Sequence, residues 1–437
     1  MSSRAEHWLS YIDRPSERDA WRAVSAAGLG TAIELYDFQL YAVLAVTFSP
    51  LFFAPGNPTA ALLATLAIFA VGFFVRPLGG VVFGLIGDRR GRATTLAVTI
   101  LGIGFASAGI GLLPVHASVG LAAPALLLLL RMAQGFFAGG ELTGASTYIA
   151  ECSPPDRRGF FGAFNPGFAT LGLTFANAAA GLTRGIVGPG AMQTWGWRLP
   201  FLLSIPLTIV CFWSRSRLEE SPHFRAVVAE KKIPHAPLRE IFSTYRRELA
   251  QVIGLAFAQN AAGYVCLVYL NIHLTKTLHY DSTEVFWLLA VVTFVASLLM
   301  PVAGAISDRI GRKPLLAAGL LGYIVLAPTT LYAATLGSFP ITCVAVCVSV
   351  FPFVVVQGVG YPFYAEVFPT RVRYSGISAG FNIATILGGG TAPYIAAWLT
   401  NVTGSSLSPS WYVVGASVLG LLTLATVKET ARVPLRA

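Results

Sequence analysis

Five ionisable residues lie inside long apolar stretches of this sequence: Glu34, Asp37, Arg76, Arg131 and Glu141. Each costs about 2.5 to 3.5 kcal/mol at the centre of a membrane helix, so a functional reason is expected for each. Glu34 and Asp37 are three residues apart and share one face of a helix. A carboxylate among apolar groups and beside an arginine can change its protonation state near neutral pH. An arginine can bind the carboxylate of a ligand.

Our interpretation is that Glu34 and Asp37 form a proton site, while Arg76 or Arg131 binds the carboxylate of a ligand. Protonation of the acid would then free an arginine for the ligand. The three acids outnumber the two bases, which also favours a titrating group. The alternative is that these charges form static pairs between helices, for example Glu34 with Arg76. Glu141 fits such a purely structural role best.

Uncharged polar side chains also occur in the middle of apolar stretches. In the second part of the chain they are Gln259, Asn260, Tyr264, Gln357, Tyr361 and Asn382, and Asn165 is a similar case in the first part. We expect these residues to supply neutral hydrogen bonds to the ligand. Single polar residues in membrane helices also bridge neighbouring helices, and this alternative stays open for each of them.

The composition places the chain in a lipid bilayer. Hydrophobic residues make up 55% of its 437 residues and charged residues only 11%, with a mean hydropathy of +0.68, which leaves too few ionisable groups for a soluble protein. The net charge of +10 is scattered through short loops, which argues against nucleic acid as a partner. The five cysteines have no metal-binding spacing, and no ATP-binding loop is present. Neither a metal nor a cofactor is expected.

Twelve stretches are long enough to cross a membrane as helices, which takes about 20 apolar residues. They exceed the length of a membrane strand and do not alternate in polarity. The predicted fold is an all-α membrane protein with twelve transmembrane helices in two pseudo-symmetric six-helix halves. The predicted spans are residues 23–48, 60–86, 93–113, 120–149, 160–187, 197–214, 248–275, 284–306, 313–335, 339–364, 374–400 and 410–427.

The basic residues give this arrangement an orientation. Nearly all of the 30 Lys and Arg residues lie in the two tails or in loops on one side. The exceptions are Arg184, Arg198 and Lys276 on the other side, and Arg76 and Arg131 inside spans. Since basic loops stay in the cytoplasm, we predict a plasma (inner) membrane protein with both termini cytoplasmic. The predicted parts are a tail (1–22), a six-helix half (23–214), a cytoplasmic linker (215–247), a second half (248–428) and a tail (429–437).

A charged turn occurs once in each half. The run Gly-Leu-Ile-Gly-Asp-Arg-Arg-Gly-Arg and the run Gly-Ala-Ile-Ser-Asp-Arg-Ile-Gly-Arg place the same three residue types between adjacent spans, namely Asp88, Gly91 and Arg92, then Asp308, Gly311 and Arg312. A second repeat has a glutamate seven residues before an arginine, in Glu151 with Arg158 and Glu366 with Arg373. Such groups can pair across helices and hold the cytoplasmic face shut until the halves rock. The alternative is that they are topology signals and surface ion pairs.

The two charged turns resemble the signature loop of the major facilitator superfamily. Other motifs are similar to the metabolite:proton symporter family, which includes proline/betaine, α-ketoglutarate, citrate and shikimate transporters. These motifs are Gly30 to Phe38, Arg76 to Gly80, Arg131 to Gly135, Gly139 to Glu141 and Trp195 to Pro200. The first motif departs from the family pattern at Thr31 and Leu35, where Asn and Trp are usual. We therefore expect a pocket of different shape.

The resemblance implies a secondary active transporter that works by alternating access, as a monomer in the bilayer, with a small molecule and a proton as its partners. The expected function is proton-coupled symport of a carboxylate-bearing metabolite. Leu142 to Ser146 and Lys428 to Thr430 favour a proline/betaine-type osmolyte, whereas Gly388 to Pro393 fit the organic-acid branches equally well. A proton-coupled efflux carrier of the same fold is the open alternative. A channel or receptor is disfavoured, and so is an enzyme, because no nucleophile–base set is visible.

Overall fold

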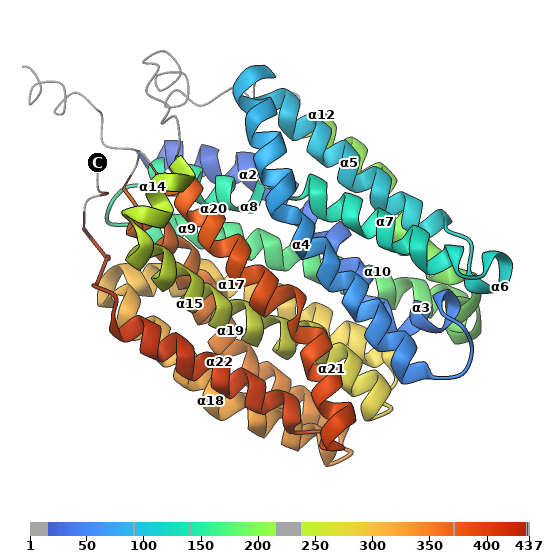
Figure 1. The fold of residues 1–437 in the computed structure, drawn as a ribbon. Helices are drawn as coiled ribbons and strands as arrows, with labels where there is room; N and C mark the ends of the chain where they lie inside the picture. The colour runs from blue at the N-terminus through green and yellow to red at the C-terminus, as the bar shows by residue number, and fades with distance from the viewer. Residues whose placement is uncertain are drawn as a thin grey trace, which may run out of the picture.

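The computed structural model describes residues 16–90, 92–139, 141–215, 237–369, 372–433 and 435. The side chains of residues 26, 27, 84, 85, 87–90, 92–97, 141–143, 214, 215 and 237–239 lie outside this description. In the described ranges the chain consists of helices joined by short turns, and Figure 1 shows them side by side in one elongated bundle. The all-helical fold predicted from the sequence is confirmed.

The helices coincide with the twelve predicted spans. In order, the spans are α2 (Glu17–Val43) with α3 (Ala45–Phe52); α4 (Pro58–Arg90); α5 (Arg92–Leu112); α7 (Ala122–Phe137) with α8 (Glu141–Glu151); α9 (Arg158–Gly162) with α10 (Phe164–Ala191); α11 (Arg198–Leu202) with α12 (Ser204–Arg215); α15 (Arg246–Gly263) with η2 (Tyr264–Tyr269), α16 (Leu270–Ile272) and η3 (His273–Thr277); α17 (Ser282–Ile310); α18 (Arg312–Thr335); α19 (Phe339–Val367); α20 (Arg373–Ala384) with η4 (Thr385–Gly390) and α21 (Ala392–Thr403); and α22 (Ser408–Ala425).

Shorter helices connect some spans: α6 (His116–Val119), η1 (Met192–Gly196) and α14 (Pro237–Ser243). The helix α14 is the described part of the predicted linker, whose residues 216–236 lie outside the description. At one end of the bundle in Figure 1 lie α14, α9 and the C-terminal segment, and at the other end lie α3 and α6. We call the first end the inner face, because it carries the residues predicted to face the cytoplasm, and the second the outer face.

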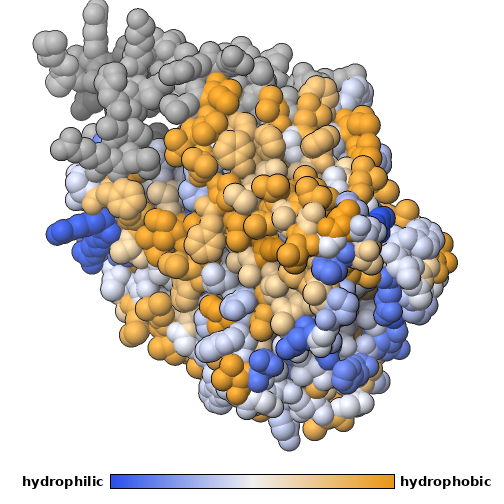
Figure 2. Space-filling view, turned by 45° about the vertical axis from the view of Figure 1, so that its right-hand side comes forward, coloured by the Kyte–Doolittle hydropathy of each residue, from blue (hydrophilic) through white to orange (hydrophobic). Residues whose placement is uncertain are grey.

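The sides of the bundle are suited to lipid. Large apolar side chains are exposed there, including Phe105, Leu121 and Ile186, each at least 80% exposed. Figure 2 shows hydrophobic residues over most of one side and hydrophilic residues toward its lower end. Among the described residues, six helices are each long and apolar enough to cross a membrane. Exposed apolar side chains at this density are stable only against hydrocarbon.

Several spans are interrupted, which the sequence did not predict. The first span bends by 62° between α2 and α3. The seventh contains the π-helical segments η2 and η3, and the eleventh contains η4. The residues Tyr264 in η2 and Thr385 in η4 line the central cavity described below. Such π segments are frequent at functional sites, because they re-aim side chains within a helix.

Glycines allow α4 and α7 to cross at very short range. A Cβ atom at Gly79 would lie 1.7 Å from the carbonyl oxygen of Phe136, and one at Gly135 would lie 1.9 Å from that of Gly72. The backbones therefore touch where no larger residue fits, as in other closely packed membrane helices. This contact holds Arg76 on α4 beside Arg131 on α7.

We expect Gly135→Val to lower the thermal stability of the purified protein strongly. The substitution forces α4 and α7 apart, and such overpacking costs about 1 to 3 kcal/mol or more. The matched control is Gly185→Ala in α10, where a Cβ would meet no atom within 4 Å. Thermal unfolding in detergent measures both variants. Equal melting temperatures for the two variants would contradict the close crossing.

Candidate functional site

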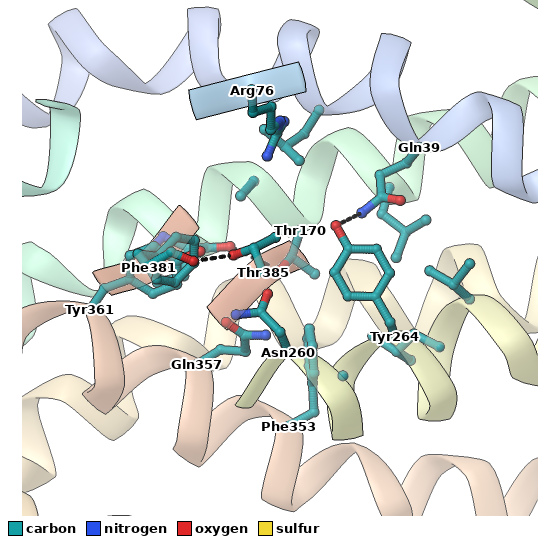
Figure 3. A pocket seen from close by; sticks show the side chains of 17 residues that line it. Gln39, Arg76, Thr170, Asn260, Tyr264, Phe353, Gln357, Tyr361, Phe381 and Thr385 are labelled. Atoms are coloured by element: carbon teal, nitrogen blue, oxygen red, sulfur yellow. Dashed lines mark hydrogen bonds between the residues drawn. The ribbon is translucent and has the colours of Figure 1, made fainter. Parts of the chain in front are cut away.

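A cavity lies in the middle of the bundle between the two halves. Its walls come from α2, α4 and α10 on the N-terminal side and from α15, η2, α19, α20 and η4 on the C-terminal side. Figure 3 shows Arg76 on one side of the cavity, opposite Asn260 and Gln357. The polar and aromatic residues that line it are Gln39, Arg76, Thr170, Asn260, Tyr264, Phe353, Gln357, Tyr361, Phe381 and Thr385.

The cavity brings together five of the residues proposed for ligand binding: Arg76, Asn260, Tyr264, Gln357 and Tyr361. They come from four separate helical segments of both halves. A pocket shared in this way changes shape whenever the halves move relative to each other. Four of the uncharged polar residues that were proposed in the second half therefore line this cavity.

Other proposed ligand-binding residues lie outside the lining. Gln259 lies behind the wall, where its Nε2 donates to Gln357 Oε1 at 2.6 Å and its Oε1 accepts from the Tyr364 hydroxyl at 2.7 Å. It thereby orients Gln357. The amide of Asn165 donates to Ser146 Oγ at 2.6 Å. These contacts fit the alternative role of joining helices.

Two further proposals, Asn382 and Glu141, have different outcomes. Asn382 donates to Ser378 Oγ at 3.3 Å, one turn away on its own helix, and is not among the lining residues. The side chain of Glu141 lies outside the described residues.

Arg76 is the charged side chain among the described lining residues. Its Nη2 lies 3.8 Å from Glu34 Oε1, a distance too long for a tight hydrogen-bonded pair. Its guanidinium lies over the rings of Phe38 and Phe73, at 4.2 and 5.1 Å from their centroids. The Nε and Nη2 atoms have no hydrogen-bond partner among the described residues. Arg76 therefore presents donors to the cavity that a bound anion can use.

Arg131 has a different environment from Arg76. Its guanidinium is enclosed by the rings of Phe38, Tyr41 and Phe69, at 3.8, 4.8 and 4.6 Å. Its Nη1 donates to the Phe38 carbonyl at 3.0 Å and to Gln134 Oε1 at 2.9 Å. Arg131 is fully buried and does not line the cavity. In this conformation it joins α7 to α2 and keeps the Phe38 ring against Arg76.

Asp37 lies inside the N-terminal half, away from the cavity. The Ser204 hydroxyl of α12 donates to its Oδ1, and the Ser107 hydroxyl of α5 also hydrogen-bonds the carboxyl. Gln134 of α7 donates to Ser107 Oγ at 2.7 Å and to the Asp37 carbonyl at 3.4 Å. Asp37 is 1% exposed, and no described cation pairs with it. A buried carboxyl that has hydroxyl partners and no described cation beside it can exist in both the neutral and the charged form, which a proton carrier requires.

The structure thus separates the two carboxyls that were proposed as one proton site. Glu34 faces Arg76 on α4, whereas Asp37 faces α5 and α12. Residues three apart on a helix differ by about 60° in direction. In a bundle this difference is enough for them to meet different neighbours.

Three polar lining residues were not predicted from the sequence: Gln39, Thr170 and Thr385. Gln39 donates from Nε2 to the Tyr264 hydroxyl at 3.3 Å and so connects the two halves across the cavity. A polar residue five positions after Glu34 in an apolar span was the available signal. The hydroxyls of Thr170 and Thr385 donate to carbonyls in their own helices, which is how threonines in membrane helices are usually satisfied.

The inner face is closed by a buried ion cluster between the halves. The Arg312 guanidinium contacts Glu366 Oε1 at 2.9 Å and Asp308 Oδ1 at 2.8 Å. Arg158 of the N-terminal half reaches Glu366 Oε1 at 3.6 Å. We call Arg158, Asp308, Arg312 and Glu366 the inner cluster. The side chains of these four residues are at most 8% exposed, so their interactions are little screened by water.

The repeated glutamate–arginine pairs exchange partners between the halves. Glu366 pairs with Arg158, and Glu151 pairs with Arg373 at 3.0 Å. Each bond therefore joins one half to the other, not two residues of the same repeat. This arrangement supports the prediction that these residues hold the inner face shut, and argues against surface pairs within one half.

The second charged turn adds a helix cap across the halves. Asp308 accepts hydrogen bonds from the backbone N–H groups of Gly159 and Phe160, at 2.8 and 2.9 Å, at the start of α9. Gly311 allows the sharp turn into α18 because its φ of 107° is one that other residues rarely adopt. In the first turn, Gly91 and the side chains of Asp88 and Arg92 lie outside the described residues.

The C-terminal segment packs on the inner cluster. Glu429 accepts from the backbone N–H groups of Arg312 and Lys313, at 2.9 and 3.0 Å. Partial burial acts to raise the pKa of Glu429, but the backbone N–H donors of Ala431, Arg312, Lys313 and Thr430 together outweigh it and the pKa is lowered. The Thr430 hydroxyl donates to Glu366 Oε2 at 2.7 Å. The segment after the last span is therefore part of the closed inner face.

We expect Glu366→Gln to loosen the inner face. The substitution keeps the shape but leaves Arg158 and Arg312 with less compensation, and breaking a buried pair costs about 3 to 5 kcal/mol. The amides of Gly159 and Phe160 should then exchange hydrogen for deuterium at least about tenfold faster, as measured by mass spectrometry. The matched control is Glu284→Gln, an exposed carboxylate at the outer face. An unchanged exchange rate in Glu366→Gln would contradict the role of the inner cluster.

Comparisons with known proteins agree with this architecture. The family model for sugar (and other) transporters matches residues 23–236 and again 226–437. A glycine betaine/proline/ectoine/pipecolic acid transporter of Dickeya dadantii is 36% identical over 427 residues, covering 95% of this chain and 84% of the relative. The proline/betaine transporter of Escherichia coli K12 is 35% identical over 424 residues, covering 95% and 85%.

Among solved structures, the proton:xylose symporter of the major facilitator superfamily bound to 6-bromo-6-deoxy-D-glucose has the same fold. Its TM-score is 0.75 at 18% identity, covering 96% of this chain and 98% of the other. The resemblance stated from the motifs is therefore confirmed, and so is the twelve-helix fold. The chain belongs to the sugar (and other) transporter family of the major facilitator superfamily, and it is a multi-pass membrane transporter and not an enzyme.

Proposed function

We propose that this protein is a proton-coupled symporter that imports a small zwitterionic osmolyte of the betaine or proline type. The observation that carries the proposal is the charge pattern of the cavity. Its described lining holds one cation, Arg76, several aromatic rings and amides, and no carboxylate. A zwitterionic ligand fits this lining if its carboxylate binds the one cation and its ammonium group is bound without a carboxylate from the protein.

The carboxylate of the ligand would bind Arg76, whose Nε and Nη2 have no partner among the described residues. The ammonium would face the rings on the opposite side, which include Tyr264, Phe353 and Tyr361. A quaternary or fully substituted ammonium binds aromatic faces through cation–π attraction and donates few or no hydrogen bonds. A tricarboxylate would bring three negative charges to a single arginine, so the organic-acid alternative is less well matched.

In proton coupling, the two carboxyls of the first span would have different roles. We assign the transported proton to Asp37, which is enclosed by Ser107 and Ser204, and the control of Arg76 to Glu34. Protonation of Asp37 would alter how α2 packs on α5 and α12. Because α2 also carries Glu34 and Gln39, this change reaches the cavity. The coupling needs no direct contact between the proton and the ligand.

The transport cycle would alternate between an opening at the inner face and one at the outer face. The inner cluster and the pair Glu151–Arg373 would separate when the inner face opens. We assign the inner face to the cytoplasm, together with both termini, because most Lys and Arg residues lie on that side. The cavity is formed by both halves of one chain, which supports a monomer as the working unit.

The test is uptake into proteoliposomes that contain the purified protein. Labelled glycine betaine, proline and ectoine are compared with citrate, α-ketoglutarate and shikimate, with and without an imposed pH gradient. We expect the zwitterions to accumulate only with the gradient, and the organic acids neither to accumulate nor to compete. Accumulation of citrate in preference to glycine betaine would overturn the substrate assignment. Equal uptake with and without the pH gradient would overturn the proton coupling.

A further inference from the structure

Three side-chain amides belong to the described lining of the cavity: Gln39, Asn260 and Gln357. The carbonyl oxygen of an amide only accepts hydrogen bonds, and its NH₂ group only donates them. The two ends of a zwitterion need opposite partners, because a carboxylate needs donors and the N–H groups of an ammonium need an acceptor. The orientation of each amide therefore bears on which zwitterions the cavity binds.

The orientation of the Asn260 amide is fixed by its own helix. Its Nδ2 donates to the Ala256 carbonyl at 2.7 Å, one turn earlier in α15. A backbone carbonyl can only accept, so the amide nitrogen must face Ala256 and the oxygen must face away from it. The Oδ1 atom has no hydrogen-bond partner among the described residues. Asn260 is only 5% exposed and lines the cavity opposite Arg76 in Figure 3. It therefore offers a carbonyl oxygen to the ligand.

The other two amides offer no such oxygen. Gln357 Oε1 already accepts from Gln259 Nε2 at 2.6 Å, and Gln357 Nε2 has no partner among the described residues. Gln357 therefore presents a donor. The Nε2 atom of Gln39 donates to the Tyr264 hydroxyl, and its Oε1 is enclosed by protein. Among the described amides of the lining, Asn260 is thus the one whose oxygen a ligand can reach.

Asn260 lies on the same wall as the aromatic rings that face the ammonium. It precedes Tyr264 by four residues, so the two side chains share one face of the seventh span. Phe353 and Tyr361 line the same C-terminal side of the cavity. The described lining holds no carboxylate. The N–H groups of a bound ammonium therefore have the Asn260 oxygen as their carbonyl acceptor.

We propose that Asn260 is a specificity-determining residue, whose Oδ1 accepts a hydrogen bond from the ammonium N–H of the ligand. The rings bind substituted and fully methylated ammonium groups alike, because cation–π attraction requires only the charge. A fully methylated ammonium covers the Asn260 oxygen without supplying a donor, and a desolvated acceptor without a partner weakens binding. This role rests on the proposed function and narrows its substrate class. The site prefers zwitterions with an N–H group, such as proline, to fully methylated betaines.

The experiment uses a ligand series on the purified full-length protein. Proline, N-methylproline and N,N-dimethylproline keep the same ring and carboxylate while methyl groups replace the N–H groups in turn. Their affinities are measured by isothermal titration calorimetry in detergent, without a pH gradient. We expect the unmodified protein to bind proline about tenfold more tightly than N,N-dimethylproline, with N-methylproline closer to proline.

Asn260→Leu should remove this preference. Leucine has a similar size but no acceptor, so the affinity for proline falls about tenfold while that for N,N-dimethylproline does not fall. The matched control is Asn177→Leu, because Asn177 also donates to the carbonyl one turn earlier but does not line the cavity. It should keep the full preference. Gln357→Leu should weaken proline and N,N-dimethylproline by the same factor, because both ligands carry the carboxylate.

The ligand series and the variants can each contradict the role of Asn260. Equal affinity of the unmodified protein for proline and N,N-dimethylproline would overturn it, and this result requires no variant. A folded Asn260→Leu protein with the parental preference would also overturn it, and Asn260→Ala gives the same test with a smaller side chain. If no member of the series bound, the proposed function would fail as well. Equal binding of all three ligands would remove only the role of Asn260.

Discussion

Asp37→Asn abolishes accumulation driven by a pH gradient, while exchange of labelled for unlabelled substrate across the membrane continues. Asparagine keeps the size of the side chain and can still accept from Ser204, but it cannot bind and release a proton. A gradient of one pH unit supplies about 1.4 kcal/mol per proton, which corresponds to about a tenfold concentration ratio. The variant should lose this ratio entirely. The measurement is uptake into proteoliposomes with the gradient on or off, followed by counterflow.

The comparison variant for Asp37→Asn is Glu34→Gln. Glu34 faces Arg76, so its loss should alter the apparent affinity for substrate first. If Glu34→Gln abolishes gradient-driven accumulation while Asp37→Asn retains it, the two carboxyls have the opposite roles. Full accumulation in Asp37→Asn would remove Asp37 from the coupling mechanism.

Arg76→Gln should weaken substrate binding by roughly 10- to 100-fold, because hydrogen bonds to a charged group contribute about 1.5 to 3 kcal/mol. The variant also strips Glu34 of its described cationic neighbour and should lower the melting temperature of the protein. Substrate binding to the purified protein and thermal unfolding are measured on the same samples. Binding at the parental affinity would contradict the role of Arg76 as the carboxylate anchor.

A double variant separates the two effects of removing Arg76. Glu34→Gln combined with Arg76→Gln removes both charges, so the melting temperature should recover while binding stays weak. Arg131→Lys is a further comparison, because Arg131 is enclosed by aromatic rings and does not line the cavity. It should affect stability more than affinity. Recovery of affinity in the double variant would mean that Arg76 acts through folding alone.

The course of the chain through the membrane was predictable from the sequence. A run of about 20 apolar residues in a bilayer forms a membrane-spanning helix. The positions of the basic loops then predict on which side of the membrane each loop lies. The helices α17, α18 and α19 begin and end within a few residues of the predicted spans. The interruptions were not predictable in this way. The break at Leu44 and the π segments depend on contacts with distant helices, which hydropathy does not encode.

The candidate site was predictable in part. Charges such as Arg76 are expensive in a membrane, so their positions in the sequence mark a functional region by themselves. Uncharged side chains carry a weaker signal, because Asn165 and Gln39 look alike in the sequence. One joins helices within a half and the other reaches across the cavity. The direction in which a side chain points, not its type, decides between these roles.

The least predictable feature was which residue each charged side chain contacts. The glutamate–arginine repeats suggested pairing at the inner face, but not that Glu151 pairs with Arg373 of the other half. The two carboxyls of span 1 share a helical face by their spacing, yet Asp37 contacts α5 and α12 whereas Glu34 contacts α4. These outcomes follow from the packing of several helices at once. Sequence spacing describes only one helix at a time.

Substrate-driven proton movement tests the central claim most directly. Proteoliposomes with a pH-sensitive dye inside and no initial pH gradient are given external glycine betaine. A permeant ion at equal concentration on both sides holds the membrane voltage at zero. We predict acidification of the interior that follows glycine betaine entry, is absent with citrate and is abolished by Asp37→Asn. Entry of labelled glycine betaine without any change in internal pH would contradict proton-coupled symport.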